Sequence, residues 1–128
     1  MIPKKINIAI VGFGNIGSYF YKILEKNKIR ITNKTGKIPF IKYISAKNLK
    51  KKRNVSIPRS KWLKRSIDLV YKDDVDVIVE LIGGSDGPAK KLVLSALKNK
   101  KHVITANKAL MAKHGNELAT LAEKNNVN

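Results

Sequence analysis

INIAIVGFGNIG, residues 6–17, joins an apolar run directly to three glycines spaced as Gly-x-Gly-x-x-Gly. Residues 6–11 are apolar at nearly every position, which is typical of a strand buried on both faces of a parallel sheet. In residues 15–26, apolar side chains recur every three or four positions, which predicts a helix. A strand, a glycine turn and a helix in this order are the context that the dinucleotide-binding fingerprint requires.

The three glycines have different tasks in that fingerprint. Gly12 permits the tight turn, Gly14 has no side chain to keep a pyrophosphate away, and Gly17 lets the helix lie close to the strand. The backbone N–H groups of residues 14–17 and the positive end of the helix can then hold the phosphates. A glycine turn that only serves close packing is the alternative interpretation.

The rest of the chain continues the alternation of strands and helices. Apolar runs predict three further strands, at residues 40–45, 76–82 and 102–105. Helical spacing predicts helices over 60–70, from Pro88 onward, and near 108–114 and 116–124. The polar residues 27–39 contain Gly36 and Pro39 and predict a loop, and Asp86 is expected to cap the helix that begins at Pro88.

This order predicts an α/β fold, a Rossmann-like doubly wound parallel sheet with right-handed crossovers. We interpret residues 1–128 as one nucleotide-binding domain. The sequence ends where a further strand is due, so we expect that it stops before a substrate-binding and dimerisation domain.

Charge is distributed unevenly along the chain. Residues 1–67 hold 18 Lys and Arg against one acid, whereas residues 68–128 hold 9 against 8. Such a basic half can bind nucleic acid, so a polyanion-binding module on a Rossmann core is one alternative. Basic patches also steer ligands and aid solubility, and we expect no nucleic-acid partner.

Composition excludes several other classes. There is no cysteine, which excludes disulfides, thiolate metal sites and a thiol nucleophile. No apolar run approaches the roughly 20 residues of a membrane span, and we expect a cytoplasmic protein with no membrane partner. His102 and His114 lack ligand-like neighbours in the sequence, so we expect no metal site.

The cations gather after the second predicted strand, in SAKNLKKKR, residues 45–53. In dinucleotide-binding folds this strand usually ends in an acid that binds the adenosine ribose, and NADP sites carry a cation instead. Lys47 stands there, and we expect it to contact the 2′-phosphate. The preferred coenzyme is therefore NADP(H), with NAD(H) as the alternative. For Lys50, Lys51 and Lys52 taken singly, solvated side chains without a ligand are the better interpretation.

Three segments of the second half carry a family resemblance: ELIGG (residues 80–84), PA (88–89) and TANKAL (105–110). With SAKNLKKKR, which is similar to the family's segment after the second strand, they resemble the N-terminal NAD(P)-binding domain of homoserine dehydrogenases. The resemblance covers nearly the whole chain and is poorest at residues 27–39. It implies an NAD(P)-dependent oxidoreductase that interconverts L-aspartate 4-semialdehyde and L-homoserine in threonine and methionine biosynthesis, and a homo-oligomer at full length. Another semialdehyde or sugar-phosphate dehydrogenase is the remaining alternative.

The resemblance also implies roles for single residues. Those expected to contact the coenzyme are Phe13, Asn15, Ile16 and Lys47. Those expected to line its nicotinamide end are Gly83, Gly84, Thr105, Asn107 and Lys108.

Lys108 is the implied catalytic residue. An ammonium beside an aldehyde can stabilise the negative charge that hydride delivery builds on the oxygen, or supply a proton. A surface lysine that begins a helix is the alternative.

Glu80 lies on a buried strand and needs a partner, either in a structural hydrogen bond near the glycine turn or in catalysis. The family's substrate contacts and second catalytic lysine lie beyond residue 128, so we expect this chain to be inactive alone.

Overall fold

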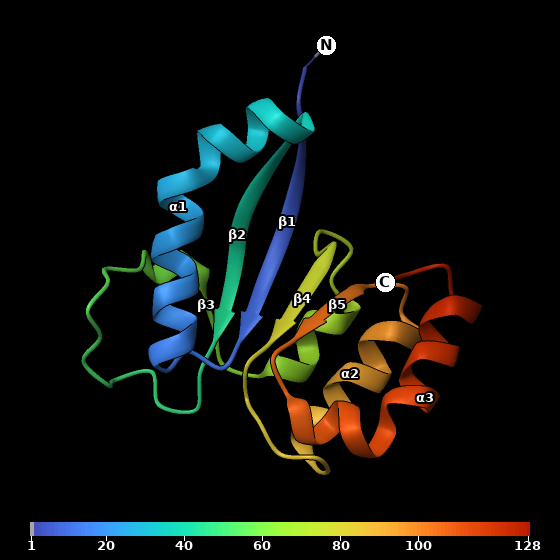
Figure 1. Cartoon of the computed structure of the whole chain (residues 1–128). Coiled ribbons are helices and arrows are strands. Elements are labelled where there is room, and N and C mark those ends of the chain that lie inside the picture. Colours follow the sequence, from blue (N-terminus) through green and yellow to red (C-terminus); the bar gives the residue numbers. More distant parts are fainter. Residues whose placement is uncertain (1) are drawn as a thin grey trace.

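The computed structural model describes residues 2–128, which are built around one five-stranded sheet. In chain order the elements are β1 (Lys4–Val11), α1 (Asn15–Thr35), β2 (Lys37–Ser45), the 3-10 helix η1 (Arg59–Lys61), β3 (Trp62–Leu63), the 3-10 helix η2 (Ser66–Tyr71), β4 (Val77–Glu80), α2 (Pro88–Lys98), β5 (His102–Thr105) and α3 (Lys108–Lys124). The strands lie in the order β3-β2-β1-β4-β5 and all four pairings are parallel (Figure 1). The predicted Rossmann-like α/β fold is confirmed.

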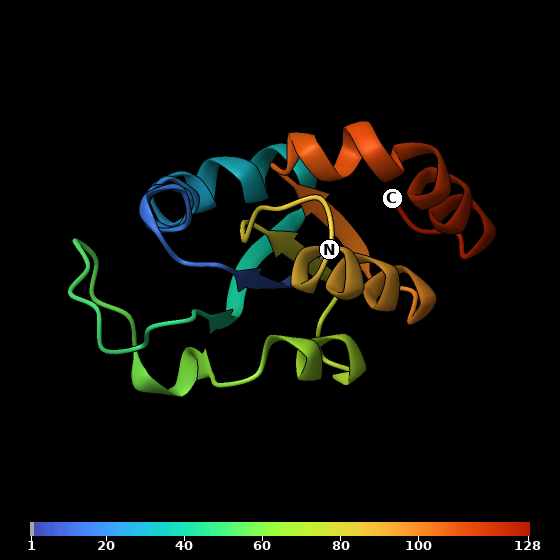
Figure 2. The same cartoon turned by 90° about the horizontal axis from the view of Figure 1, so that it is seen from below.

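Both faces of the sheet are covered. Ile8 and Ile10 of β1 pack on one face with Tyr21 of α1. Ala9 and Val11 point to the opposite face and pack with residues of η2 and α2. Figure 2 shows α1 and the green η1–η2 segment on opposite sides of the strands. This burial on both faces explains why β1 reads as a continuous apolar run in the sequence.

Helix α1 is longer than the sequence pattern predicts. The expected loop over residues 27–39 is wrong, because α1 continues to Thr35 and β2 begins at Lys37. The hydroxyls of Thr32 and Thr35 each donate to the backbone carbonyl four residues earlier, at 2.8 Å. The helix ends at Gly36, which adopts a φ of 71° and donates its N–H to the Thr32 carbonyl. Left-handed glycine at this position is a common way to end a helix.

Other boundaries also differ from the predictions. The helix expected over 60–70 is instead two 3-10 helices separated by β3, which pairs with the end of β2. Strand β4 covers Val77–Glu80 rather than residues 76–82. The two helical pieces expected around Gly115 form one continuous helix, α3, which packs on α2 near β5.

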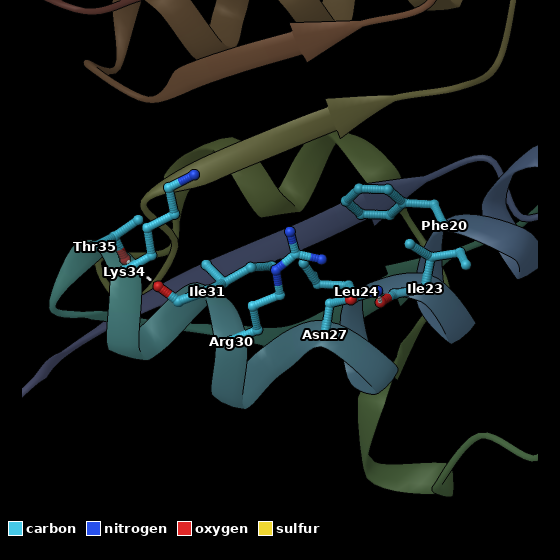
Figure 3. A pocket seen from close by; sticks show the side chains of 8 residues that line it. All are labelled: Phe20, Ile23, Leu24, Asn27, Arg30, Ile31, Lys34 and Thr35. Carbon is cyan, nitrogen blue, oxygen red and sulfur yellow. Dashed lines mark hydrogen bonds between the residues drawn. The ribbon is translucent and has the colours of Figure 1, made fainter.

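A shallow apolar hollow of about 320 Å³ runs along α1 (Figure 3). It is lined by Phe20, Ile23, Leu24, Asn27, Arg30, Ile31, Lys34 and Thr35. All of these residues come from one helix, and none belongs to the glycine turn, so we do not place the coenzyme there. None of the helices within residues 2–128 is long and apolar enough to cross a membrane.

Candidate functional site

The strand order places the candidate site at the carboxyl ends of the strands. From β1 the chain first builds outward through β2 and β3, then returns to the other side of β1 for β4 and β5. The order reverses between β1 and β4, and ligands of open α/β sheets bind beyond the carboxyl ends of the strands at such a switch point. Figure 1 shows the arrowheads of β1, β2, β4 and β5 converging at this end of the sheet.

The glycine turn after β1 is fastened to both neighbouring strands. Gly12 donates its N–H to the carbonyl of Ser45 at the end of β2, at 2.9 Å, and Leu81 donates to the Val11 carbonyl at 2.8 Å. Gly12 has a φ of +95°, and a Cβ there would lie 2.7 Å from the Leu81 backbone. Only glycine therefore fits this position without strain.

The two later glycines of the turn differ in their surroundings. A Cβ on Gly17 would lie 2.7 Å from the Gly12 carbonyl oxygen, so α1 can approach the turn only because this side chain is missing. A Cβ on Gly14 would have nothing within 4 Å. Gly14 thus borders open space, where a ligand can reach the backbone.

The N-terminus of α1 faces this space without a cap. Gly14 is the N-cap, no side chain bonds the free N–H groups, and the first turn holds no acid. Asn15 and Ile16 lie in that turn with Gly17, and Ile16 is 65% exposed. The first N–H groups of a helix have no partner within it, and with the helix dipole they attract an anion.

Beside the turn lies a cleft of about 640 Å³. Its lining residues are Val11, Gly12, Phe13, Gly14, Ser45, Ala46, Lys47, Asn48, Lys51, Arg53, Lys64, Ser66, Leu81, Ile82 and Pro88. The structure thus brings four of the predicted residues together here: Gly12, Phe13, Gly14 and Lys47. Its charged lining residues are all basic, so the lining within residues 2–128 favours a polyanionic ligand.

Sequence reasoning missed part of this cleft. Lys64 and Ser66 reach it because β3 pairs with β2 and places Leu63 beside Ser45. A two-residue strand has no periodicity that the sequence could reveal. The side chain of Phe13 also differs from the simplest expectation of coenzyme contact. The residue is 3% exposed and its ring packs edge-on against Trp62 at 5.6 Å, so the ring is not presented to a ligand.

A second group of predicted residues lies at the ends of β4 and β5, organised by Glu80. This side chain is fully buried. Its Oε2 accepts from the N–H groups of Ile82 and Gly83, at 2.7 and 3.1 Å, and its Oε1 accepts from the Thr105 hydroxyl at 2.6 Å. Glu80 therefore holds the loop after β4, rather than the first glycine turn, and joins it to β5.

The same network continues into α3. The Thr105 hydroxyl accepts from the N–H of Asn107 at 3.0 Å. The Asn107 amide donates to the Gly84 carbonyl at 2.6 Å, while its oxygen accepts from the N–H of Leu110 at 3.0 Å and caps α3. Lys108 is the exposed first residue of α3. Gly83, Gly84, Thr105 and Asn107 thus belong to one hydrogen-bonded cluster, which Lys108 directly follows in the chain, and none of the five is among the lining residues of the basic cleft.

Asp86 does not cap α2 as predicted. The N-cap is Gly87, without a side-chain bond, and Asp86 instead pairs with two residues of α3. Its oxygens lie 2.6 Å from the Lys113 ammonium and 3.0 Å from Nε2 of His114. Hydrogen bonds from Lys113 and then His114 hold the pKa of the Asp86 carboxyl well below its usual range. Asp86, Lys113 and His114 together fasten the loop between β4 and α2 to α3.

Within the described residues, no cluster of three potential metal ligands is found.

Comparisons with known proteins agree with this geometry. The family described as "Homoserine dehydrogenase, NAD binding domain" matches residues 12–128. The homoserine dehydrogenases of Neisseria gonorrhoeae and Bacillus subtilis are 40% and 38% identical to this chain, over 124 and 122 residues. These matches cover 97% and 95% of this chain, but 28% of each relative.

A solved structure gives the same result. The crystal structure of Staphylococcus aureus homoserine dehydrogenase at pH 7.5 is similar to this one with a TM-score of 0.89 and 42% identity. The similarity covers 97% of this chain and 32% of that one, so this chain spans less than a third of the length of these three relatives. Fold, glycine turn and family match lead to one conclusion: the chain belongs to the homoserine dehydrogenase family and corresponds to its NAD-binding domain.

Proposed function

We propose that this chain is the coenzyme-binding domain of an NADP(H)-dependent homoserine dehydrogenase. The reaction is the interconversion of L-aspartate 4-semialdehyde and L-homoserine, on the route to threonine and methionine. One observation carries the proposal. The basic cleft at the switch point combines an uncapped helix N-terminus with the side chains of Lys47, Lys51 and Lys64, and no acid among its lining residues repels a third phosphate.

Different residues bind different parts of the coenzyme. The backbone of Gly12 to Gly17 and the open space at Gly14 fit a pyrophosphate. Lys47, directly beyond the end of β2, holds the 2′-phosphate of the adenosine. The Glu80 network sets the positions of Gly83, Gly84, Thr105 and Asn107 around the nicotinamide end. NAD(H), which lacks the extra phosphate, binds more weakly.

Lys108 is the proposed catalytic residue of this domain. A nicotinamide held here would supply the hydride for reduction of the semialdehyde. The role of the Lys108 ammonium would be to stabilise the negative charge on the carbonyl oxygen or to donate a proton to it. The Asn107 side chain caps α3 by accepting from the N–H of Leu110, and so fixes the backbone position of Lys108, the first residue of that helix.

The remainder of the enzyme supplies what this chain lacks. We assign residues 1–128 to one domain, and the substrate contacts and dimer interface to other parts of a cytoplasmic homo-oligomer. The 128-residue chain alone then binds coenzyme without turning over substrate. Appreciable NADPH-dependent reduction of the semialdehyde by this chain would contradict that assignment.

Titration of the chain with NADPH and NADH tests the coenzyme preference. Binding is followed by calorimetry for the wild type, Lys47→Glu and the control Lys26→Glu, which makes the same charge reversal on an exposed position of α1. We expect Lys47→Glu to weaken NADPH binding by tenfold or more, at roughly 1.4 kcal/mol per tenfold, and to change NADH binding far less. Equal losses for both coenzymes, or a control as weak as Lys47→Glu, would remove Lys47 from the phosphate site.

The charge of +18 favours a second candidate, a polyanion-binding module. Both candidates predict binding that weakens with salt. Only the module predicts tight binding to generic duplex DNA, with a steep salt dependence that reflects many phosphate contacts. Titration with a duplex at two salt concentrations distinguishes them, and we expect NADPH to bind far more tightly than DNA.

A further inference from the structure

Arg53 differs from the other cations of the loop after β2. We name residues 46–54 the basic loop. The Arg53 guanidinium donates to four backbone carbonyls, three within the loop and one outside it. The distances are 2.6 Å to Asn48, 3.5 Å to Leu49 and 3.0 Å to Lys51. The fourth bond runs from Nε to the carbonyl of Phe13 in the glycine turn, also at 3.0 Å.

The guanidinium also lies against the apolar core. Its central carbon is 5.0 Å from the centre of the Trp62 ring and 5.7 Å from that of Phe13. The two rings pack edge-on against each other and belong to the core cluster beside α1. Arg53 is half-buried, whereas Lys51 and Lys52 are exposed. Cation–π contacts of this kind add to the hydrogen bonds that hold the side chain in place.

We propose that Arg53 is a positioning residue, which shapes the basic loop around its guanidinium and fastens that loop to the glycine turn. Arg53 also lines the cleft, but four of its five N–H donors already bond backbone carbonyls, which leaves one for a ligand. The residues that it positions are Lys47 and Lys51, which line the cleft. The effect on coenzyme binding rests on the proposed function, whereas the fastening of the loop does not.

The bond to Phe13 has a second consequence. A peptide unit is planar and trans, so its carbonyl and its N–H point in opposite directions. By holding the Phe13 carbonyl, Arg53 also fixes the direction of the Gly14 N–H, which belongs to the N-cap of α1. One side chain thus sets both the basic loop and an amide of the proposed pyrophosphate site.

Lysine cannot replace arginine in this role. A guanidinium presents five N–H donors in a rigid planar fork, whereas an ammonium is a point charge with three donors. Arg53→Lys therefore keeps the charge but loses most of the four-carbonyl contact. A residue that acts by charge tolerates this change, and a residue that acts by shaping a loop does not.

Hydrogen exchange of the coenzyme-free chain tests the fastening of the loop. The variants are Arg53→Lys, Arg53→Gln and the matched control Arg59→Lys at an exposed position of η1. We expect amides of residues 46–54 to exchange about tenfold faster in both Arg53 variants, and as in the wild type in the control. Emission of Trp62, the only tryptophan, should change in the same two variants. Wild-type exchange in Arg53→Lys would overturn the proposal. If Arg53→Gln fails to fold, Arg53→Lys carries the comparison.

Coenzyme titration then distinguishes positioning from direct contact. If Arg53 positions both the basic loop and the Gly14 amide, Arg53→Lys and Arg53→Gln weaken NADPH binding by similar factors, about tenfold, and NADH binding also falls, because both coenzymes carry the pyrophosphate. If Arg53 instead acts only through its charge on the 2′-phosphate, Arg53→Lys keeps most of the affinity for NADPH, only Arg53→Gln loses it, and NADH binding is unchanged in both variants. A wild type that binds neither coenzyme refutes the proposed function, and hydrogen exchange still decides the role of Arg53.

Discussion

Replacement of Glu80 by leucine should be strongly destabilising, although it removes a buried charge. Apolar replacement of buried polar groups can be neutral when both partners are removed together. Here two of the three partners are the backbone N–H groups of Ile82 and Gly83, which no substitution removes. The third is the Thr105 hydroxyl. The cost therefore comes from donors left without an acceptor.

The size of the effect follows from these bonds. An orphaned donor costs about 1–3 kcal/mol, and Ile82 and Gly83 lie near enough to the surface for water to reduce that cost. We therefore expect Glu80→Leu to lower the free energy of unfolding by roughly 3–5 kcal/mol, a large part of the 5–15 kcal/mol of a typical domain. Glu80→Gln keeps the shape and one acceptor oxygen, and should cost about 1–2 kcal/mol.

Urea unfolding followed by circular dichroism measures both values. Glu123→Gln, an exposed carboxylate on α3, is the control and should stay within about 0.5 kcal/mol of the wild type. Thr105→Val removes one of the three bonds. Combined with Glu80→Leu, its effect should be less than additive, because the two residues share that bond. A Glu80→Leu protein as stable as the wild type, or additive effects in the double variant, would refute the reasoning.

Three further changes test other parts of the site. Gly17→Ala places a Cβ 2.7 Å from the Gly12 carbonyl, and should destabilise the chain by about 1–3 kcal/mol and weaken coenzyme binding, as unfolding and titration would show. Asn107→Ala removes the cap of α3 and should cost about 1 kcal/mol, visible in urea unfolding. Asp86 has a lowered pKa, so its stabilising effect is complete above the unfolded value near 4 and is lost as pH falls toward the folded value. Asp86→Asn should therefore be less stable than the wild type at neutral pH, and the difference should disappear in acid; a constant difference would contradict the ion pair.

The sequence predicts the first strand, turn and helix because each has a local physical cause. Gly12 and Gly17 are required by close approaches of 2.7 Å, and the apolar run follows from burial on both faces of the sheet. The C-terminal half of α1 is predicted less well. Its residues are mostly polar, and Ile29 and Ile31 alone do not continue the apolar stripe that marks a helix. Gly36 and the basic residue Lys34 before it are signals for the end of that helix.

The sequence could not predict which residues far apart in the chain contact each other. Lys64 reaches the cleft through a two-residue strand, and its place depends on β2. The bonds of Arg53 to Phe13 span 40 residues, and those of Glu80 to Thr105 span 25. A cation or an acid in the sequence indicates that a partner is needed, but only the fold decides which groups come within reach.

The charged residues of the site divide according to what they bond. Arg53 and Glu80 bond backbone and hydroxyl groups, one at each side of the glycine turn, and so determine where the loops lie. Lys47 and Lys108 are exposed at the positions that these loops create. Substitution of an exposed lysine should therefore change affinity or rate with little effect on stability. Substitution of Arg53 or Glu80 should change ligand binding and local stability together, because the ligand-facing groups move with the backbone that carries them.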